Sequence, residues 1–98
     1  MDPTSDTRPR DEPPTVDDWL TELGVLLPAG VVDEVGSAER AVLLDLARIA
    51  AHRSHRTAAP ISTYLVGLAL ASLPRAVRLA RMRDLASRLD LAEGDAQR

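Results

Sequence analysis

Apolar residues recur every three or four positions along most of the chain, which is the spacing that places them on one face of an α-helix. Four segments show this pattern, and they begin near Thr15, Ser37, Ala59 and Ser72. No segment shows the strict alternation of apolar and polar residues that indicates a half-buried β-strand. The pattern therefore predicts an all-α fold, a small four-helix bundle-like domain in which neighbouring helices are antiparallel and joined by short turns.

The first two predicted helices each have a start signal and one apolar face. Thr15, three residues before Asp18, resembles a capping box, and Ser37 is the expected cap of the second helix. We expect Trp19 to anchor the first helix in the core. The first apolar face consists of Val16, Trp19, Leu20 and Leu23, and the second of Val42, Leu43, Leu46, Ile49 and Ala50.

The third predicted helix is apolar almost all round, so we expect it to be central and the most buried. Gly67 in its middle then predicts the close approach of another helix. Its main stripe consists of Ile61, Tyr64, Leu65 and Leu68, widened by Val66, Ala69 and Leu70. The fourth helix, with Ser72 as its expected cap, has an inner face of Leu79, Met82, Leu85, Ala86 and Leu89 and places Arg75, Arg78, Arg81 and Arg88 mostly outside it.

The remaining segments are polar or rich in helix breakers. Residues 1–14 combine four prolines with charge and predict a disordered acidic tail, residues 15–91 a single helical domain, and residues 92–98 a frayed C-terminus. Residues 24–36 contain three glycines and a proline, so we expect a connection there with one helical turn at residues 31–35. No apolar leader or membrane span is visible, and a cytoplasmic location is the default expectation.

Composition excludes several classes of function. The 98 residues contain no cysteine, which rules out disulfide scaffolds, thiolate zinc sites, iron–sulfur clusters and cysteine nucleophiles. Trp19 and Tyr64 are the only aromatic residues, too few for a row of base-stacking platforms. No complete catalytic group can be assembled, and no cofactor is implied. We therefore expect a chain that is not an enzyme.

Charge is distributed unevenly, although the net charge is only −3. Residues 1–39 carry two arginines against ten acidic residues, residues 40–88 carry nine arginines against two, and residues 89–98 carry one against three. The predicted helical body is therefore basic and both ends are acidic. This asymmetry indicates charged partners, or an acidic arm that lies on a basic surface.

The junction of the second and third helices is the best candidate for a site. A helix start exposes unpaired N–H groups and partial positive charge, which together bind anions. The alternative is that the cations neutralise the end of the second helix and the hydroxyls bond back to the third, an arrangement that is common. The candidate anion-binding residues are His52, Arg53, His55, Arg56, Ser62 and Thr63.

Other constellations favour ordinary helix surfaces. His52 and His55 lack the third protein ligand that a zinc site needs, so no metal site is predicted. Asp45, Arg48 and His52 have the spacing of a solvated helix face. The arginine face of the fourth helix lacks a helix-turn-helix pattern with polar base readers, so nucleic acid is an unlikely partner.

Three stretches resemble a small actinobacterial helical domain of unknown function, which occurs alone or fused to the nucleotidyltransferase that makes molybdopterin-guanine dinucleotide. They are residues 16–20 (VDDWL), 43–52 (LLDLARIAAH) and 56–67 (RTAAPISTYLVG), and they depart from the family at Thr57 and Tyr64, where proline and phenylalanine are more frequent. The resemblance implies a non-catalytic accessory domain in molybdenum cofactor biosynthesis, with a nucleotidyltransferase or molybdoenzyme as its protein partner.

Two alternatives stay open at this point. The basic body with its acidic tail suits an anion- or nucleic-acid-binding module that the tail regulates. The limited burial available to so short a chain also suits self-association, for example a homodimer formed through an apolar patch.

Overall fold

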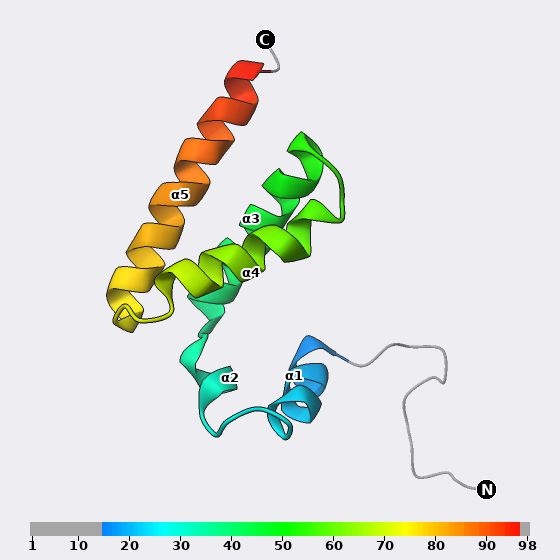
Figure 1. Cartoon of the computed structure of the whole chain (residues 1–98), viewed down its shortest axis with the longest axis vertical. Coiled ribbons are helices and arrows are strands. Elements are labelled where there is room, and N and C mark those ends of the chain that lie inside the picture. The colour runs from blue at the N-terminus through cyan, green and yellow to red at the C-terminus, as the bar shows by residue number, and fades with distance from the viewer. Residues whose placement is uncertain (1–14, 97–98) are drawn as a thin grey trace, which may run out of the picture. The chain divides into compact units, whose positions relative to one another are not determined.

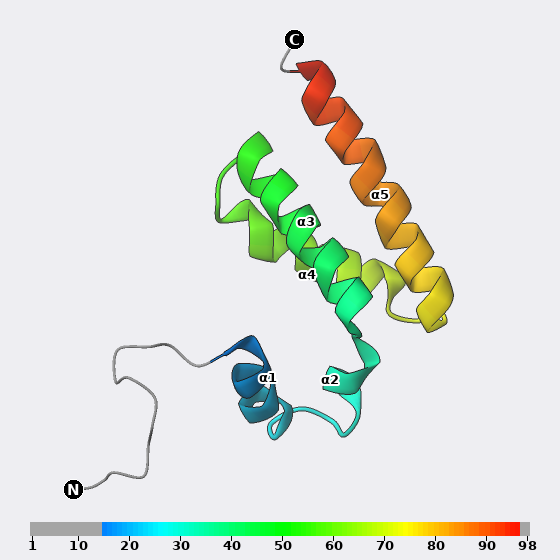
Figure 2. The same ribbon diagram turned by 180° about the vertical axis from the view of Figure 1, so that it is seen from behind.

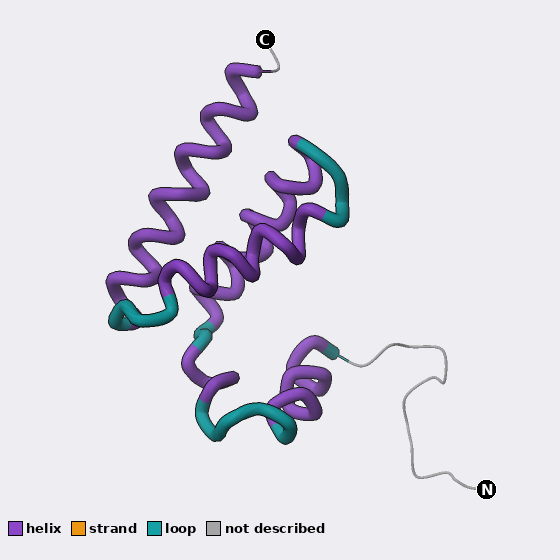
Figure 3. Tube along the Cα trace, viewed as in Figure 1, coloured by secondary structure: helices purple, strands orange, loops and turns teal. Residues whose placement is uncertain are grey.

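The computed structural model describes the backbone of residues 15–96 and the side-chain surroundings of residues 15–91 (Figure 1). This range contains helices and connecting loops and no strand (Figure 3), so the all-α prediction is confirmed. The predicted acidic tail, residues 1–14, lies outside it. None of the described helices combines the length and the apolarity needed to cross a membrane. The helices are α1 (Val16–Gly24), α2 (Val31–Glu34), α3 (Ser37–Arg53), α4 (Ala58–Leu70) and α5 (Arg75–Ala96).

The chain divides into two compact units, with the boundary between Asp33 and Glu34. In the first unit α1 begins as predicted, because the Thr15 hydroxyl accepts a hydrogen bond from the Asp18 amide at 3.0 Å. The expectation that Trp19 is a core anchor is wrong, since 51% of this residue is exposed and α1 has no buried residue. The described part of this unit is too short to cover a whole helix face with its own side chains.

The second unit is built from three helices, of which α3 is the central one. α3 packs against both α4 and α5, whereas α4 and α5 make little contact with each other. Figures 1 and 2 show these two helices diverging from the short turn of residues 71–74 that connects them. The α3–α4 connection, residues 54–57, is equally short, as predicted.

The core of the second unit lies between α3 and α5. Its buried apolar residues are Leu46, Ile49, Met82 and Ala86, all of which belong to the predicted inner faces of these helices. Ser37 is not a cap, because α3 already begins there and no side-chain hydrogen bond caps it. Ser72 is not a cap either, because α5 begins only at Arg75. The buried residues therefore lie on the predicted inner faces, whereas two predicted helix caps are wrong.

The position of α4 contradicts the expectation drawn from its composition. Its stripe of Ile61, Tyr64, Leu65 and Leu68 is 57–67% exposed, and α4 has no buried residue. The opposite face of α4 packs on α3, and the three-helix unit has no further layer to cover the stripe. A Cβ at Gly67 would meet nothing within 4 Å, so the close approach that we expected there does not occur.

Candidate functional site

A buried ion pair links the starts of α3 and α5. Arg78 Nε lies 2.7 Å from Glu39 Oε2, and Arg78 Nη2 lies 2.9 Å from Glu39 Oε1. The same Nη2 also donates to the Glu34 carbonyl oxygen at 2.9 Å. Only 8% of Arg78 and 4% of Glu39 is exposed. The expectation of a solvated arginine face on this helix is therefore wrong for Arg78.

This pair holds the fold together and offers little to a ligand. Its hydrogen bonds to Glu39 raise the pKa of Arg78 above the ordinary value for arginine, and the charge of Glu39 acts in the same direction. Planar, two-pronged pairing of guanidinium and carboxylate is the strong geometry for such groups. Because Nε and Nη2 are both engaged within the protein, we assign Arg78 a structural role.

The predicted anion site at the α3–α4 junction has fewer free backbone donors than its sequence suggests. The Ala58 amide donates to the His55 carbonyl oxygen at 2.8 Å, and the Ala59 amide donates to the Arg56 carbonyl oxygen at 3.2 Å. The next residue, Pro60, has no N–H group. The anion-binding capacity of this junction therefore rests on side chains rather than on the helix start.

The side chains of the junction divide into two groups. The Thr63 hydroxyl bonds back to the Ala59 and Pro60 carbonyl oxygens, each at 3.1 Å, and His55 Nδ1 lies 3.0 Å from the Thr57 hydroxyl. Arg53 and Ser62, in contrast, line a common hollow, which His52, His55, Arg56 and Thr63 do not line. Anion binding by these six residues stays a prediction.

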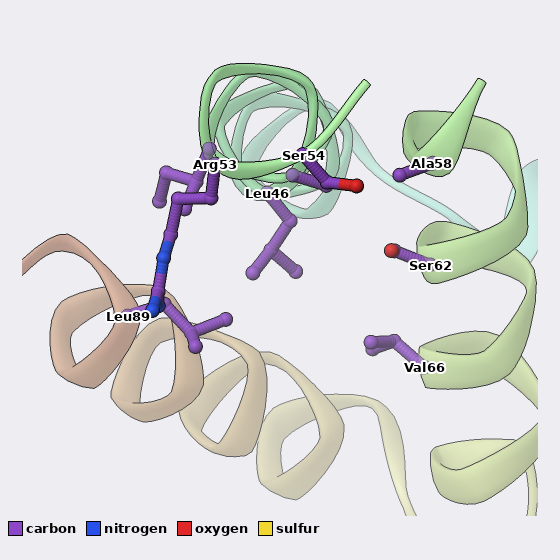
Figure 4. Close-up of a pocket in the computed structure, with 9 residues that line it drawn as sticks. Leu46, Arg53, Ser54, Ala58, Ser62, Val66 and Leu89 are labelled. Carbon is purple, nitrogen blue, oxygen red and sulfur yellow. The ribbon is translucent and has the colours of Figure 1, made fainter. Parts of the chain in front are cut away.

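The hollow that Arg53 and Ser62 share has a volume of about 360 Å³ and lies between the diverging helices, on α3. Figure 4 shows Leu46, Val66 and Leu89 reaching into it from three helices, while the side chain of Arg53 extends towards Leu89. The hydroxyls of Ser54 and Ser62 face it as well. Its lining consists of Leu46, Ile49, Ala50, Arg53, Ser54, Ala58, Ser62, Val66 and Leu89.

A second hollow of about 340 Å³ lies between α4 and α5, and its lining shares Val66 with that of the first. It is lined by Leu65, Val66, Ala69, Leu70, Arg81, Asp84, Leu85 and Arg88. Because Val66 lines both hollows, we treat them as one feature and call it the α4–α5 groove. The exposed stripe of α4 borders it, since Leu65 belongs to both.

The charges of the groove lie at its ends and along α5. Arg53 stands in one hollow and Arg81 in the other, and neither forms an ion pair with any described residue. Asp84, the one acidic residue of the lining, is paired with Arg88 at 3.0 Å. The α4 wall, residues 58–70, contains no charged residue. The groove is therefore apolar with a net positive rim.

Sequence patterns did not reveal this groove. Val66, Leu85 and Leu89 were expected to be ordinary core residues, and their spacing is the same whether or not a neighbouring helix covers them. Arg53 and Ser62 were predicted as site residues, but as part of an anion site at the α3–α4 junction and not of a groove. The signal in the sequence is the unusual apolarity of residues 58–70, which contain no charged residue.

Metal-ligating side chains do not gather in the described part of the chain. No three histidine or acidic side chains there are placed to hold a metal ion. Asp45 and Arg48 form the surface pair that their spacing predicts, at 2.9 Å, and Arg48 also lies 3.5 Å from Asp90.

Comparison with known proteins provides a family. No curated protein and no solved structure matches the chain significantly. A family described as a domain of unknown function, DUF6457, matches residues 11–97, which is all but the first ten residues and the last one. On this match the chain, an all-helical fold with an open groove, belongs to the DUF6457 family.

Proposed function

We propose that this chain is a non-catalytic interaction domain that docks onto a protein of molybdenum cofactor biosynthesis. The observation that carries the proposal is the exposed apolar stripe of α4, with Tyr64 at its centre and 67% exposed. Contiguous apolar patches are rare on monomeric proteins unless they bind something. Aromatic residues such as tyrosine are also typical anchors of protein interfaces.

The nature of the partner rests on the resemblance of residues 43–52 and 56–67 to a domain that is fused to a nucleotidyltransferase. Fusion keeps two modules at a high effective concentration, which favours a weak but specific contact between them. A stand-alone copy of such a module would use the same contact between separate chains. The resemblance thus supports one of two proteins as the partner. They are a cytoplasmic molybdopterin-guanine dinucleotide nucleotidyltransferase and the molybdoenzyme that receives the cofactor.

Calorimetric titration of this chain with the purified nucleotidyltransferase of the same organism tests the proposal. Leu65→Glu, on the exposed stripe, should weaken binding at least about tenfold, the loss expected for an interface hot spot. Leu44→Glu is the matched control, because Leu44 is 71% exposed on α3. Absence of binding by the unaltered chain to both the nucleotidyltransferase and the molybdoenzyme would contradict the proposal.

A second candidate function, binding of a polyanion, is favoured by the arginine side chains that lack an ion pair within the described range. Arg53, Arg56, Arg81 and Arg83 are of this kind, and all are exposed. Phosphate neutralisation makes binding fall steeply with salt. An affinity for DNA or RNA that shows no such dependence, or that survives Arg53→Ser with Arg56→Ser, would remove this candidate.

A further inference from the structure

The α4–α5 groove differs from the exposed stripe of α4 in that it has walls, a floor and a charge pattern. We propose that it binds an amphipathic helix of a partner protein, one that carries acidic side chains beside an apolar stripe. This inference rests on the proposed role as an interaction domain, and it adds the kind of segment that is recognised.

The shape of the groove favours a helical occupant. The two hollows share Val66 in their linings, and their walls are helices, with α4 about 20 Å long at 1.5 Å per residue. An extended peptide that adds a strand needs the unpaired edge of a sheet, and proline-rich peptides need an aromatic-lined groove. The groove has neither, because its walls are α-helical and its lining contains no aromatic side chain.

The lining predicts how the occupant is anchored. Apolar side chains on the floor and on both walls match a ligand helix with apolar residues at i, i+3, i+4 and i+7. Leu46 and Ile49 come from the floor, Val66 from one wall, and Leu85 and Leu89 from the other. Leu46 and Ile49 are already buried, so the side chains that such a helix would remove from water are the half-buried Val66, Leu85 and Leu89, and this burial favours binding.

The charges of the rim decide which amphipathic helix fits. Arg53 and Arg81 stand in different hollows, and neither is neutralised by a described residue. Acidic side chains on the flanks of the bound helix would pair with them, whereas basic ones would be repelled. Since Asp84 is already paired with Arg88, and the α4 wall is uncharged, nothing in the lining offers a site for a basic flank.

Fluorescence anisotropy with the full chain and a synthetic peptide tests the proposal. The labelled peptide is a four-turn helix with leucine at i, i+3, i+4 and i+7 of each repeat and glutamate at the exposed positions. Its twin has lysine in place of every glutamate. The glutamate peptide should bind, and the lysine twin should bind at least about tenfold more weakly. Binding of the glutamate peptide should also weaken as salt is added.

Charge reversals in the protein locate the site. Arg53→Glu and Arg81→Glu should each weaken binding of the glutamate peptide about tenfold. Arg83→Glu is the matched control, because Arg83 is exposed on the same helix as Arg81 and is absent from the lining of the groove. It should change the affinity less than about twofold, apart from the general effect of net charge.

Several outcomes would overturn the proposal. They are equal binding of the two peptides, equal effects of the Arg81 and Arg83 reversals, and displacement of the peptide by single-stranded DNA. A dimer in sedimentation that Arg81→Glu dissociates would assign the groove to a second copy instead.

If the glutamate peptide does not bind while the nucleotidyltransferase still does, the groove proposal falls and the proposed function stands. If only the peptide binds, the named partner is wrong and the groove proposal stands.

Discussion

Arg78 illustrates how a single residue organises the second unit. Its side chain is 10% exposed, and its guanidinium donates two hydrogen bonds to Glu39 and one to the Glu34 carbonyl oxygen. Taking a charge out of water costs several kcal/mol unless such bonds replace hydration. The ion pair therefore connects the start of α5 to the start of α3. Replacing only one of its two residues should destabilise the fold.

Removing the cation alone should leave an uncompensated buried carboxylate. Arg78→Met is expected to lower the free energy of unfolding by about 3–5 kcal/mol, measured by urea denaturation at neutral pH. Arg83→Met, at an exposed position on the same helix, should change it by less than about 0.5 kcal/mol. The double variant Glu39→Met with Arg78→Met should recover most of the loss. A double variant as unstable as Arg78→Met would contradict this account.

The pH dependence of this pair follows from the raised pKa of Arg78. A cation whose pKa is raised on folding stabilises the protein fully below the pKa of its unfolded form, and it loses this effect only as the pH rises through the folded value. The unaltered chain should therefore keep the pair up to about pH 11. In the Arg78→Lys variant the new lysine has an ordinary pKa of about 10.4. The free energy of unfolding of this variant should therefore fall further below that of the unaltered chain between about pH 9 and 11. A constant deficit would contradict this prediction.

At the scale of the element, α4 shows that an apolar helix need not be a central one. The face that packs on α3 contains half-buried residues such as Val66, while Ile61 on the other face is 60% exposed. α3 is less apolar than α4, yet it contributes Leu46 and Ile49 to the core. Position between two partners, rather than mean hydropathy, decides which helix is buried.

A pair of identical substitutions measures this difference. Ile49 is 1% exposed, so Ile49→Ala should lower the free energy of unfolding by about 2–5 kcal/mol through lost burial and a residual cavity. Ile61→Ala, on the exposed stripe, should cost less than about 1 kcal/mol. Urea denaturation of both variants is the measurement. Equal losses would mean that the stripe of α4 is covered in solution, for example by a second copy.

The start of α1 offers a local test within the first unit. Thr15→Ala removes the acceptor of the Asp18 amide and should destabilise α1 by about 1 kcal/mol. Thr21→Ala is the control, because the Thr21 hydroxyl only bonds back to the Asp17 carbonyl oxygen at 2.9 Å, within the helix. Amide hydrogen exchange of α1 should accelerate in the first variant and not in the second.

At the scale of the whole molecule, burial is concentrated in one of the two units. α1 and α2 have no buried residue, whereas the packing of α3 against α5 creates the core. Regions with few buried apolar contacts open with lower free energies than the global unfolding transition. Stability should therefore be uneven along the chain.

Amide hydrogen exchange followed by NMR measures this unevenness. The amide of Trp19 in α1 should exchange at least about a hundredfold faster, relative to its unstructured rate, than those of Leu46 and Ile49 in α3. The physical reason is that opening α1 exposes little apolar surface, while opening α3 exposes the core. Equal protection in both helices would show that the two units unfold together.

The local features of this protein follow from its amino-acid sequence. Helical periodicity, the Thr15 cap and the inner faces of α3 and α5 were all predicted, because hydrogen bonds within a helix and the spacing of its faces depend on residues a few positions apart. The Asp45–Arg48 pair follows from the same proximity. Within the candidate site, the sequence pattern predicted Arg53 and Ser62 as site residues. It did not indicate the hollow that both of them line.

Which apolar faces are covered and which charges are buried depends on how the helices pack together. Trp19 and the α4 stripe were expected inside and are exposed, while Arg78 was expected in solvent and pairs with Glu39, 39 positions earlier. The α4–α5 groove exists because two helices diverge above a third, which no periodicity records. Burial is a relation between distant segments, so a stripe of leucines shows that a face is apolar and leaves open what will cover it.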